Sequence, residues 1–220
     1  MPLFGRAGEG PEDLVRAAER IGVRDQRVLD ALRSVRREDF VPPGRERAAY
    51  ADRPIPIPHG QTTSQPSLIA AMVEALELTG DEKVLELGTG YGFQTALLAE
   101  LADEVWSIER YGELAETAAD NLRMADIDNA NVVVGDGSEG IPDEAPFDAI
   151  ILSAATPSIP GPLRQQLADG GRLVAPVGAG GSEDVVVFRR SGDELERVRS
   201  LTRARFVPLR RGAVPVDRDD

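Results

Sequence analysis

The stretch VLELGTGYGFQTALLAEL, from Val84 to Leu101, places a strand, a glycine loop and a helix in immediate succession. The run VLEL predicts a buried strand, GTGYG a tight turn, and TALLAEL has the apolar spacing of a helix. Gly88, Gly90 and Gly92 can adopt positive φ and let a ligand approach the backbone, while the helix directs its positive N-terminal end to the same place. The stretch therefore predicts half of a nucleotide-type binding unit.

The spacing of the loop favours S-adenosylmethionine over a dinucleotide. A dinucleotide loop reads Gly-x-Gly-x-x-Gly, with its third glycine beneath a pyrophosphate, whereas single residues separate the glycines here. Glu86 precedes the loop, and a carboxylate there suits a cationic ammonium better than a phosphate. A second predicted strand, VWSIER, carries Glu109 about 20 residues after the first glycine, where an acid that binds ribose hydroxyls is expected.

Strands and helices alternate after this stretch. The predicted elements are a helix at 114–124, strands at 132–135, 147–152 and 172–178, and a helix holding Leu163 and Leu167 before the last of these. Such alternation predicts a parallel sheet with helices on both faces. VVVF (185–188) and ARFVPL (204–209) are expected to add a hairpin edge, and residues 212–220 a frayed tail.

The N-terminal part predicts packing helices followed by an extended segment. One helix covers 11–21, with Ile21 on its buried face, and Asp25 is placed to cap a second. Residues 40–58 hold too many prolines for a helix or central strand and should lie extended across another part of the molecule. QTTSQ is then the loop before a helix that begins near Pro66, where Ser64 either caps the helix or faces the ligand site.

Ligands of open α/β sheets bind outside the carboxyl ends of the strands. The residues predicted there are Glu86 with the glycine loop, Glu109, Asp136 with Gly137, and the 153–157 loop. Asp136 after a strand either caps the next turn or contacts the adenine ring, and its place beside the other strand ends favours the contact.

The composition limits the partners. The 220 residues hold 38 acidic and 25 basic residues, a net charge of −13 that repels nucleic acids and anionic membranes. The chain has no cysteine, which excludes disulfides and thiolate metal sites. Because no long apolar run occurs, we expect a cytoplasmic protein, and we expect a monomer. Lys83 is the single lysine; this reflects either a GC-rich genome or a high-salt source, where screening tolerates an acidic surface.

Six blocks of the chain occur in an order and spacing typical of one family: AYADRPIPIPHGQTTSQP, VLELGTGYGFQTALLAEL, VWSIER, GDGSEGIP, APFDAIILSAA and RFVPL. They resemble the protein-L-isoaspartate O-methyltransferases, over about Val15 to Leu209. The glycine loop is generic to methyltransferases of this fold, whereas the block from DRPIPI to QTTSQP and the terminal FVPL are specific to the family. Thr63 departs from the isoleucine usual in the family, and Ser67 and Ile69 from histidines of animal members.

This resemblance implies an α/β, Rossmann-like methyltransferase fold with a seven-stranded, mostly parallel sheet and an N-terminal helical and extended appendage. We expect one domain over 1–220, with the appendage at 1–79, the core and edge hairpin at 80–209, and a tail at 210–220. The donor implied is S-adenosylmethionine, and the acceptor is the free carboxylate of L-isoaspartyl residues in damaged proteins. No metal is implied, since the acids at the strand ends are assigned to cofactor hydroxyls and amines.

The resemblance also assigns site residues. It implies Ser64 as the catalytic residue. The cofactor positions it implies are Pro66, Ser67, Glu86, Gly88, Thr89, Gly90, Tyr91, Gly92, Glu109, Arg110, Asp136 and Gly137. The acceptor positions it implies are Ile57, Thr62, Thr63, Val207, Pro208 and Leu209.

The chemistry needs no strong base, because an isoaspartyl carboxyl with a pKa near about 4 is ionised at neutral pH. Ser64 would only donate a hydrogen bond that positions an acceptor oxygen, and the lone His59 is interpreted as a turn residue. Two alternatives stay open: methylation of aspartate in a peptide precursor, and a non-catalytic adaptor that retains the fold.

Overall fold

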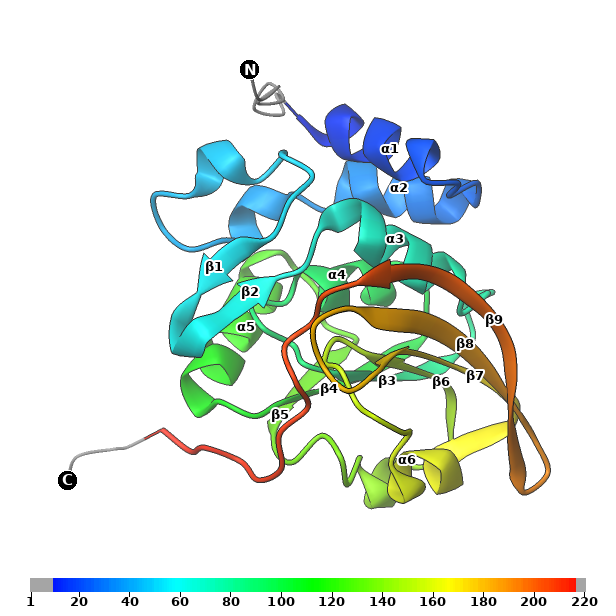
Figure 1. Cartoon of the computed structure of the whole chain (residues 1–220). Helices are drawn as coiled ribbons and strands as arrows, with labels where there is room; N and C mark the ends of the chain where they lie inside the picture. Colours follow the sequence, from blue (N-terminus) through cyan, green and yellow to red (C-terminus); the bar gives the residue numbers. More distant parts are fainter. Residues whose placement is uncertain (1–9, 217–220) are drawn as a thin grey trace.

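The computed structural model describes residues 10–216, which are built around a seven-stranded sheet in the order β5-β4-β3-β6-β7-β8-β9 (Figure 1). The strands are β3 (Lys83–Leu87), β4 (Glu104–Glu109), β5 (Ala130–Val134), β6 (Phe147–Leu152), β7 (Leu167–Val177), β8 (Glu183–Ser191) and β9 (Glu194–Ala204). The first five in this order pair in parallel, and β8 and β9 pair antiparallel at one edge. The predicted seven-stranded, mostly parallel α/β sheet is confirmed.

Helices cover both faces of the sheet. They are α1 (Pro11–Arg20), α2 (Gln26–Ser34), α3 (Pro66–Glu74), α4 (Phe93–Ala99), α5 (Gly112–Met124) and α6 (Gly161–Gln166). One hydrophobic cluster joins α1 to α4 with Val84 of β3, and a second on the opposite face joins Leu163 of α6 with Leu85 and Leu87. Because side chains alternate along a strand, Glu86 points to the same face as Val84, toward α4.

The N-terminal helices share a hydrophobic cluster with the sheet. In Figure 1, α1 and α2 stack on α3 at the end of the molecule away from α6. The Asp25 side chain accepts a hydrogen bond from the backbone N–H of Arg27 at 2.9 Å, which confirms the predicted cap. The prediction that Ile21 is buried on the helix face is wrong. Helix α1 ends at Arg20, and Ile21 lies just beyond it and is 53% exposed. The division into a single domain with three parts stays a prediction.

The proline-rich segment forms a small hairpin. Two short 3-10 turns, at 37–40 and 46–48, precede β1 (Ile55–Ile57), which pairs antiparallel with β2 (Gln61–Thr63). The predicted loop QTTSQ therefore begins as a strand. The connection runs through a third 3-10 turn, Pro58–Gly60, where His59 has a φ of 58° and Gly60 a φ of 67°, both left-handed. The hairpin lies across the end of α5 in Figure 1.

The C-terminal edge differs from the prediction. The last strand is β9 at Glu194–Ala204, so of ARFVPL only Ala204 belongs to a strand and residues 205–209 follow it. Strand β9 was missed because its exposed edge position allows charged residues without apolar alternation. Likewise, Leu167 begins β7 instead of ending α6. The prediction of a frayed tail is wrong for residues 212–216. Val214 N–H donates to the Arg110 carbonyl at 2.7 Å, and the Val214 carbonyl accepts from Gly112 N–H at 2.8 Å. Residues 217–220 lie outside the described part.

A fourth 3-10 turn spans Pro142–Glu144. No helix within residues 10–216 is long and apolar enough to cross a membrane.

Candidate active site

A cavity of about 360 Å³ opens at the carboxyl ends of the parallel strands. Its floor is formed by the loops after β3, β4, β5 and β6, around the point between β3 and β6 where the strand order reverses. Ligands of such sheets bind at this switch point. Walls from the β1–β2 hairpin and from Val207 to Arg210 complete the cavity, so it combines the glycine loop with both segments specific to the resemblance.

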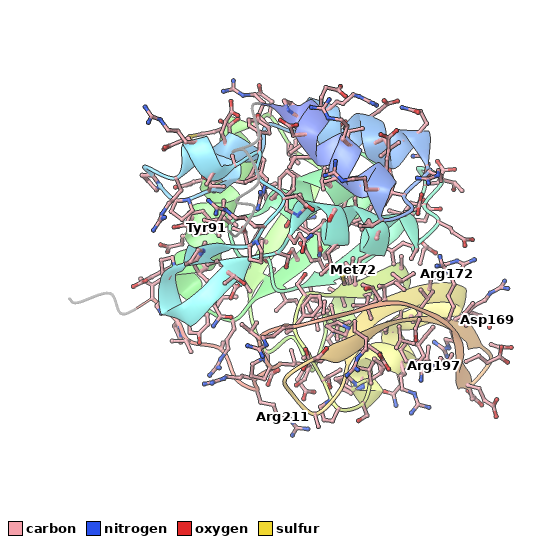
Figure 2. The ribbon with its side chains drawn as sticks, turned by 45° about the horizontal axis from the view of Figure 1, so that its top comes forward. Met72, Tyr91, Asp169, Arg172, Arg197 and Arg211 are labelled. Carbon is pink, nitrogen blue, oxygen red and sulfur yellow. The ribbon has the colours of Figure 1, made fainter. Side chains whose placement is uncertain are left out.

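The glycine loop needs its glycines. Gly88, Gly90 and Gly92 have φ values of 93°, 59° and 93°, a region that side chains with a Cβ disfavour. A Cβ built on Gly90 would lie 3.5 Å from the Cδ1 of Ile57, between the loop and the hairpin. The loop thereby keeps its backbone bare where it faces the cavity. Figure 2 shows Tyr91 of this loop on the hairpin side, remote from Asp169 and Arg172.

Glu109 ends β4 directly beside that loop. Its Oε2 accepts a hydrogen bond from Gly90 N–H at 2.9 Å, and its Oε1 accepts one from Tyr111 N–H at 3.0 Å. The residue is 5% exposed, and burial raises the pKa of its carboxyl against the lowering effect of these N–H groups. Each carboxylate oxygen has a second lone pair, so Glu109 can still accept from a ligand hydroxyl.

Glu86 lies behind the cavity wall and is fully buried. Its Oε1 accepts from Gln94 at 2.9 Å, and its Oε2 accepts from the hydroxyls of Thr95 and Ser107 at 2.5 and 2.6 Å. Burial raises its pKa to about 7, against the effect of these donors. Gln94 also donates to Ser153 Oγ at 3.0 Å, and both residues line the cavity. Glu86 therefore acts on the site through Gln94.

Ser64 lies between β2 and α3 and lines the cavity. The helix-cap interpretation is wrong: the N-cap of α3 is Gln65, and the N-terminus is held by Asp52, whose Oδ1 accepts from Ser67 N–H at 2.9 Å. Within residues 10–216 the Ser64 hydroxyl makes no hydrogen bond, while its backbone carbonyl accepts from Arg37 at 3.3 Å. This hydroxyl is thus available to a ligand.

Fourteen of the predicted site residues meet at this cavity. They are Ile57, Thr62, Thr63, Ser64, Gly88, Thr89, Gly90, Tyr91, Glu109, Arg110, Gly137, Val207, Pro208 and Leu209. The remaining five, which do not line it, are Pro66, Ser67, Glu86, Gly92 and Asp136. Pro66 and Ser67 are buried at the start of α3, and Gly92 precedes α4 with Phe40 and Leu122 against it. Direct ligand contacts of these five stay predictions.

The Asp136 carboxylate accepts hydrogen bonds from its own turn and from the C-terminal segment. Its Oδ1 accepts from Ser138 N–H at 2.9 Å, which corresponds to the turn-capping interpretation, and its Oδ2 accepts from Gly212 N–H at 2.6 Å. These donors lower the pKa of its carboxyl, against an opposing effect of burial. The adenine contact of Asp136 stays a prediction, and Gly137 next to it lines the cavity.

Sequence reasoning missed several residues of the site. His59 lines the cavity; its ring stacks on Tyr111 with centroids 4.4 Å apart, and its Nε2 lies 2.9 Å from Glu113 Oε2. It is a turn residue as predicted, but it also joins the hairpin to the start of α5. Gln94 and Arg210 are further polar lining residues, and Ser153 belongs to the 153–157 loop predicted at the strand ends. No local pattern marks Gln94 or Arg210, because they reach the cavity only through the tertiary fold.

Comparisons with known proteins give strong matches to one family. The family model described as Protein-L-isoaspartate(D-aspartate) O-methyltransferase matches residues 9–213. A protein-L-isoaspartate O-methyltransferase from Anaeromyxobacter dehalogenans (strain 2CP-C) is 54% identical over 192 residues, covering 86% of this chain and 91% of that protein. A solved protein-L-isoaspartate O-methyltransferase superposes with a TM-score of 0.81 at 26% identity, over 90% of this chain and 65% of that longer one. A Plasmodium falciparum structure in complex with S-adenosyl-L-homocysteine gives 0.77 at 21% identity, over 92% and 99%.

Proposed function

The chain belongs to the protein-L-isoaspartate(D-aspartate) O-methyltransferase family, and from this membership we propose how its cavity works. The protein is an S-adenosylmethionine-dependent O-methyltransferase that methylates the free carboxylate of L-isoaspartyl residues in damaged proteins. The observation that carries the proposal is that Ser64, with an unengaged hydroxyl, shares one cavity with the bare glycine loop and Glu109.

The residues present fit the cofactor. The bare backbone of Gly88 and Gly90 accommodates a closely approaching ligand, and a Cβ on Gly90 would narrow that space toward Ile57. Glu109 retains acceptor capacity for ribose hydroxyls, and Gly137 bounds the cavity after β5. When bound, S-adenosylmethionine supplies a sulfonium methyl group that an ionised carboxylate can attack without a base.

Glu86 and Gln94 support the donor side. Glu86 is fully buried and holds the Gln94 amide, so the Gln94 side chain stays directed at Ser153 and the cavity. A Gln94 side chain fixed in this way limits where a ligand can lie above the glycine loop. We assign Glu86 to positioning, in place of the direct ammonium contact expected from sequence.

The acceptor side is formed by the hairpin, Ser64 and the segment from Val207 to Leu209. Val207 O and Leu209 N–H are bound to Ala155 at 2.8 and 2.7 Å, which fixes this segment over the strand ends. Ser64 donates one hydrogen bond to the acceptor carboxylate and orients it, so catalysis rests mainly on proximity. Ser64 itself is not a nucleophile.

Replacing Ser64 tests this assignment. A hydrogen bond to a charged group contributes about 1.5–3 kcal/mol, so Ser64→Ala should lower kcat/KM for an isoaspartyl peptide about 10- to 100-fold. Affinity for S-adenosylhomocysteine, measured by calorimetry, should change less than about 2-fold. Ser158→Ala, at an exposed serine outside the cavity, is the matched control. Turnover by Ser64→Ala equal to that of the control would refute the role of Ser64.

The partners follow from charge and site. Isoaspartyl-containing proteins and peptides are the acceptors, and the net charge of −13 supports the proposal that nucleic acids are not. Action as a monomer stays a prediction. A cytoplasmic location and a high-salt source stay predictions.

A further inference from the structure

Arg37 places a buried positive charge behind the Ser64 segment. Its side chain is 0% exposed, and no carboxylate of residues 10–216 lies within ion-pair distance of its guanidinium. Burial lowers its pKa to about 10, partly opposed by the charge of Asp52, so it remains protonated at neutral pH. Burying a cation without an ion-pair partner is costly. A structural reason for retaining it must lie in its hydrogen bonds.

The guanidinium ties two segments together through oxygen acceptors. Nη1 donates to the carbonyls of Ala49 and Ala51 at 2.6 and 3.1 Å. Nη2 donates to the Arg53 carbonyl at 3.2 Å, to Thr63 Oγ1 at 3.1 Å and to the Ser64 carbonyl at 3.3 Å. One planar group thus fixes the segment before the hairpin against the residues that reach the cavity. Only Nε lacks a partner.

The other side of Ser64 is held as well. Asp52 lies inside the segment that Arg37 binds, and its Oδ2 accepts from Gln65 Nε2 at 2.9 Å and from Ser67 Oγ at 2.8 Å. Ser64 is therefore flanked by fixed residues on both sides. Arg37 also lies 5.5 Å from the ring centroid of Phe93, the first residue of α4 after the glycine loop. Arg37 therefore contacts both the Ser64 segment, which is proposed to bind the methyl acceptor, and the helix that follows the glycine loop.

Thr63 adds a bond that isoleucine, the usual residue of the family, could not make. Its Oγ1 accepts from Arg37 and also from Ile55 N–H at 3.3 Å, which connects the guanidinium to β1. The side chain is 8% exposed. The departure at position 63 is thereby explained as part of the same hydrogen-bonded group.

We propose that Arg37 is a positioning residue for methyl transfer, which together with Thr63 fixes the backbone of Ser64 so that its hydroxyl meets the acceptor carboxylate. The inference rests on the role proposed for Ser64. Arg37 does not line the cavity, so its effect is exerted through Ser64. A lysine would keep the charge but not the planar fork that reaches several carbonyls at once.

The test is a double-mutant cycle. Arg37→Lys, Ser64→Ala and the double variant are compared for kcat and KM on an isoaspartyl peptide, with Arg36→Lys, an exposed neighbour, as control. Arg37→Lys should lower kcat about 10-fold or more, with the Kd for S-adenosylhomocysteine within about 3-fold and an unchanged circular dichroism spectrum. In the Ser64→Ala background the same change should lower kcat less than about 2-fold, because it acts through that side chain.

Additive effects of the two changes, or wild-type kcat in Arg37→Lys, would overturn the inference. A kcat loss that matches the loss of folded protein would overturn it too. If Arg37→Lys does not fold, Thr63→Val removes one acceptor and leaves Arg37 in place; it should lower kcat about 3-fold, and unchanged kcat would contradict the proposal. A wild-type protein that binds S-adenosylhomocysteine but methylates no isoaspartyl peptide would refute the proposed function first.

Discussion

Replacing Glu86 with glutamine should flatten part of the pH dependence of stability. Glu86 is fully buried, and burial raises its pKa from 4.5 to about 7. Between these values the folded protein holds a proton that the unfolded chain has released, so unfolding becomes easier as pH rises. The difference corresponds to about 3 kcal/mol, at about 1.4 kcal/mol for each pH unit. The contribution is present below about pH 4.5 and lost as pH passes 7.

Glutamine is a suitable replacement because it preserves the shape and most hydrogen bonds. Its carbonyl can accept from Gln94 as Glu86 Oε1 does, and its amide can donate to the hydroxyls of Thr95 and Ser107, which can turn to accept. The variant has no charge to bury at any pH. Its stability should therefore not fall over the range in which Glu86 ionises.

Thermal unfolding of both proteins at pH 5, 6, 7 and 8 measures the effect. About 1 kcal/mol shifts the Tm of a chain of this size by about 2–4 °C. The wild-type Tm minus the Glu86→Gln Tm should decrease by roughly 5–10 °C from pH 5 to pH 8, while other titrating groups cancel in the difference. A difference that stays constant with pH would refute the claim that Glu86 is buried with a raised pKa.

Two further predictions concern the loop and the start of α3. Gly90→Ala adds a Cβ, 3.5 Å from Ile57, to a backbone that lines the cavity, so S-adenosylhomocysteine affinity measured by calorimetry should fall about 10-fold, or about 1.4 kcal/mol, because the ligand can no longer approach as closely; unchanged affinity would contradict the close approach. Asp52→Ala removes the acceptor of Ser67 N–H and should lower the free energy of unfolding in urea by about 1–2 kcal/mol, whereas an unaltered midpoint would show that Asp52 does not cap α3.

Local patterns predicted most of the parallel core. The stretch from Val84 to Leu101 has strand, turn and helix signals that agree with their final environment, and β3, the loop and α4 form where expected. The antiparallel edge of the sheet was harder to predict from sequence. Strand β9 pairs on one side only and is largely exposed, so its charged sequence carries no apolar alternation, and the apolar VPL after it marks a cavity wall instead.

The site shows the same division between local and tertiary information. Spacing placed Glu109 and the glycine loop correctly at one end of the sheet, because strand ends converge by topology. Spacing could not tell that Glu86, two residues before the loop, faces α4 and is occupied by three side chains. Nor could it find Arg37, whose five acceptors come from residues 12 to 27 positions away and meet only after folding.

The most direct test of the central claim is transfer of labelled methyl groups from S-adenosylmethionine to matched peptides. Three acceptors are compared: a peptide with one L-isoaspartyl residue, the same sequence with aspartyl, and an RNA. We predict base-labile methyl ester on the isoaspartyl peptide and none above background on the other two. Label on the aspartyl peptide or the RNA in preference to the isoaspartyl peptide, or on none of the three, would contradict the account.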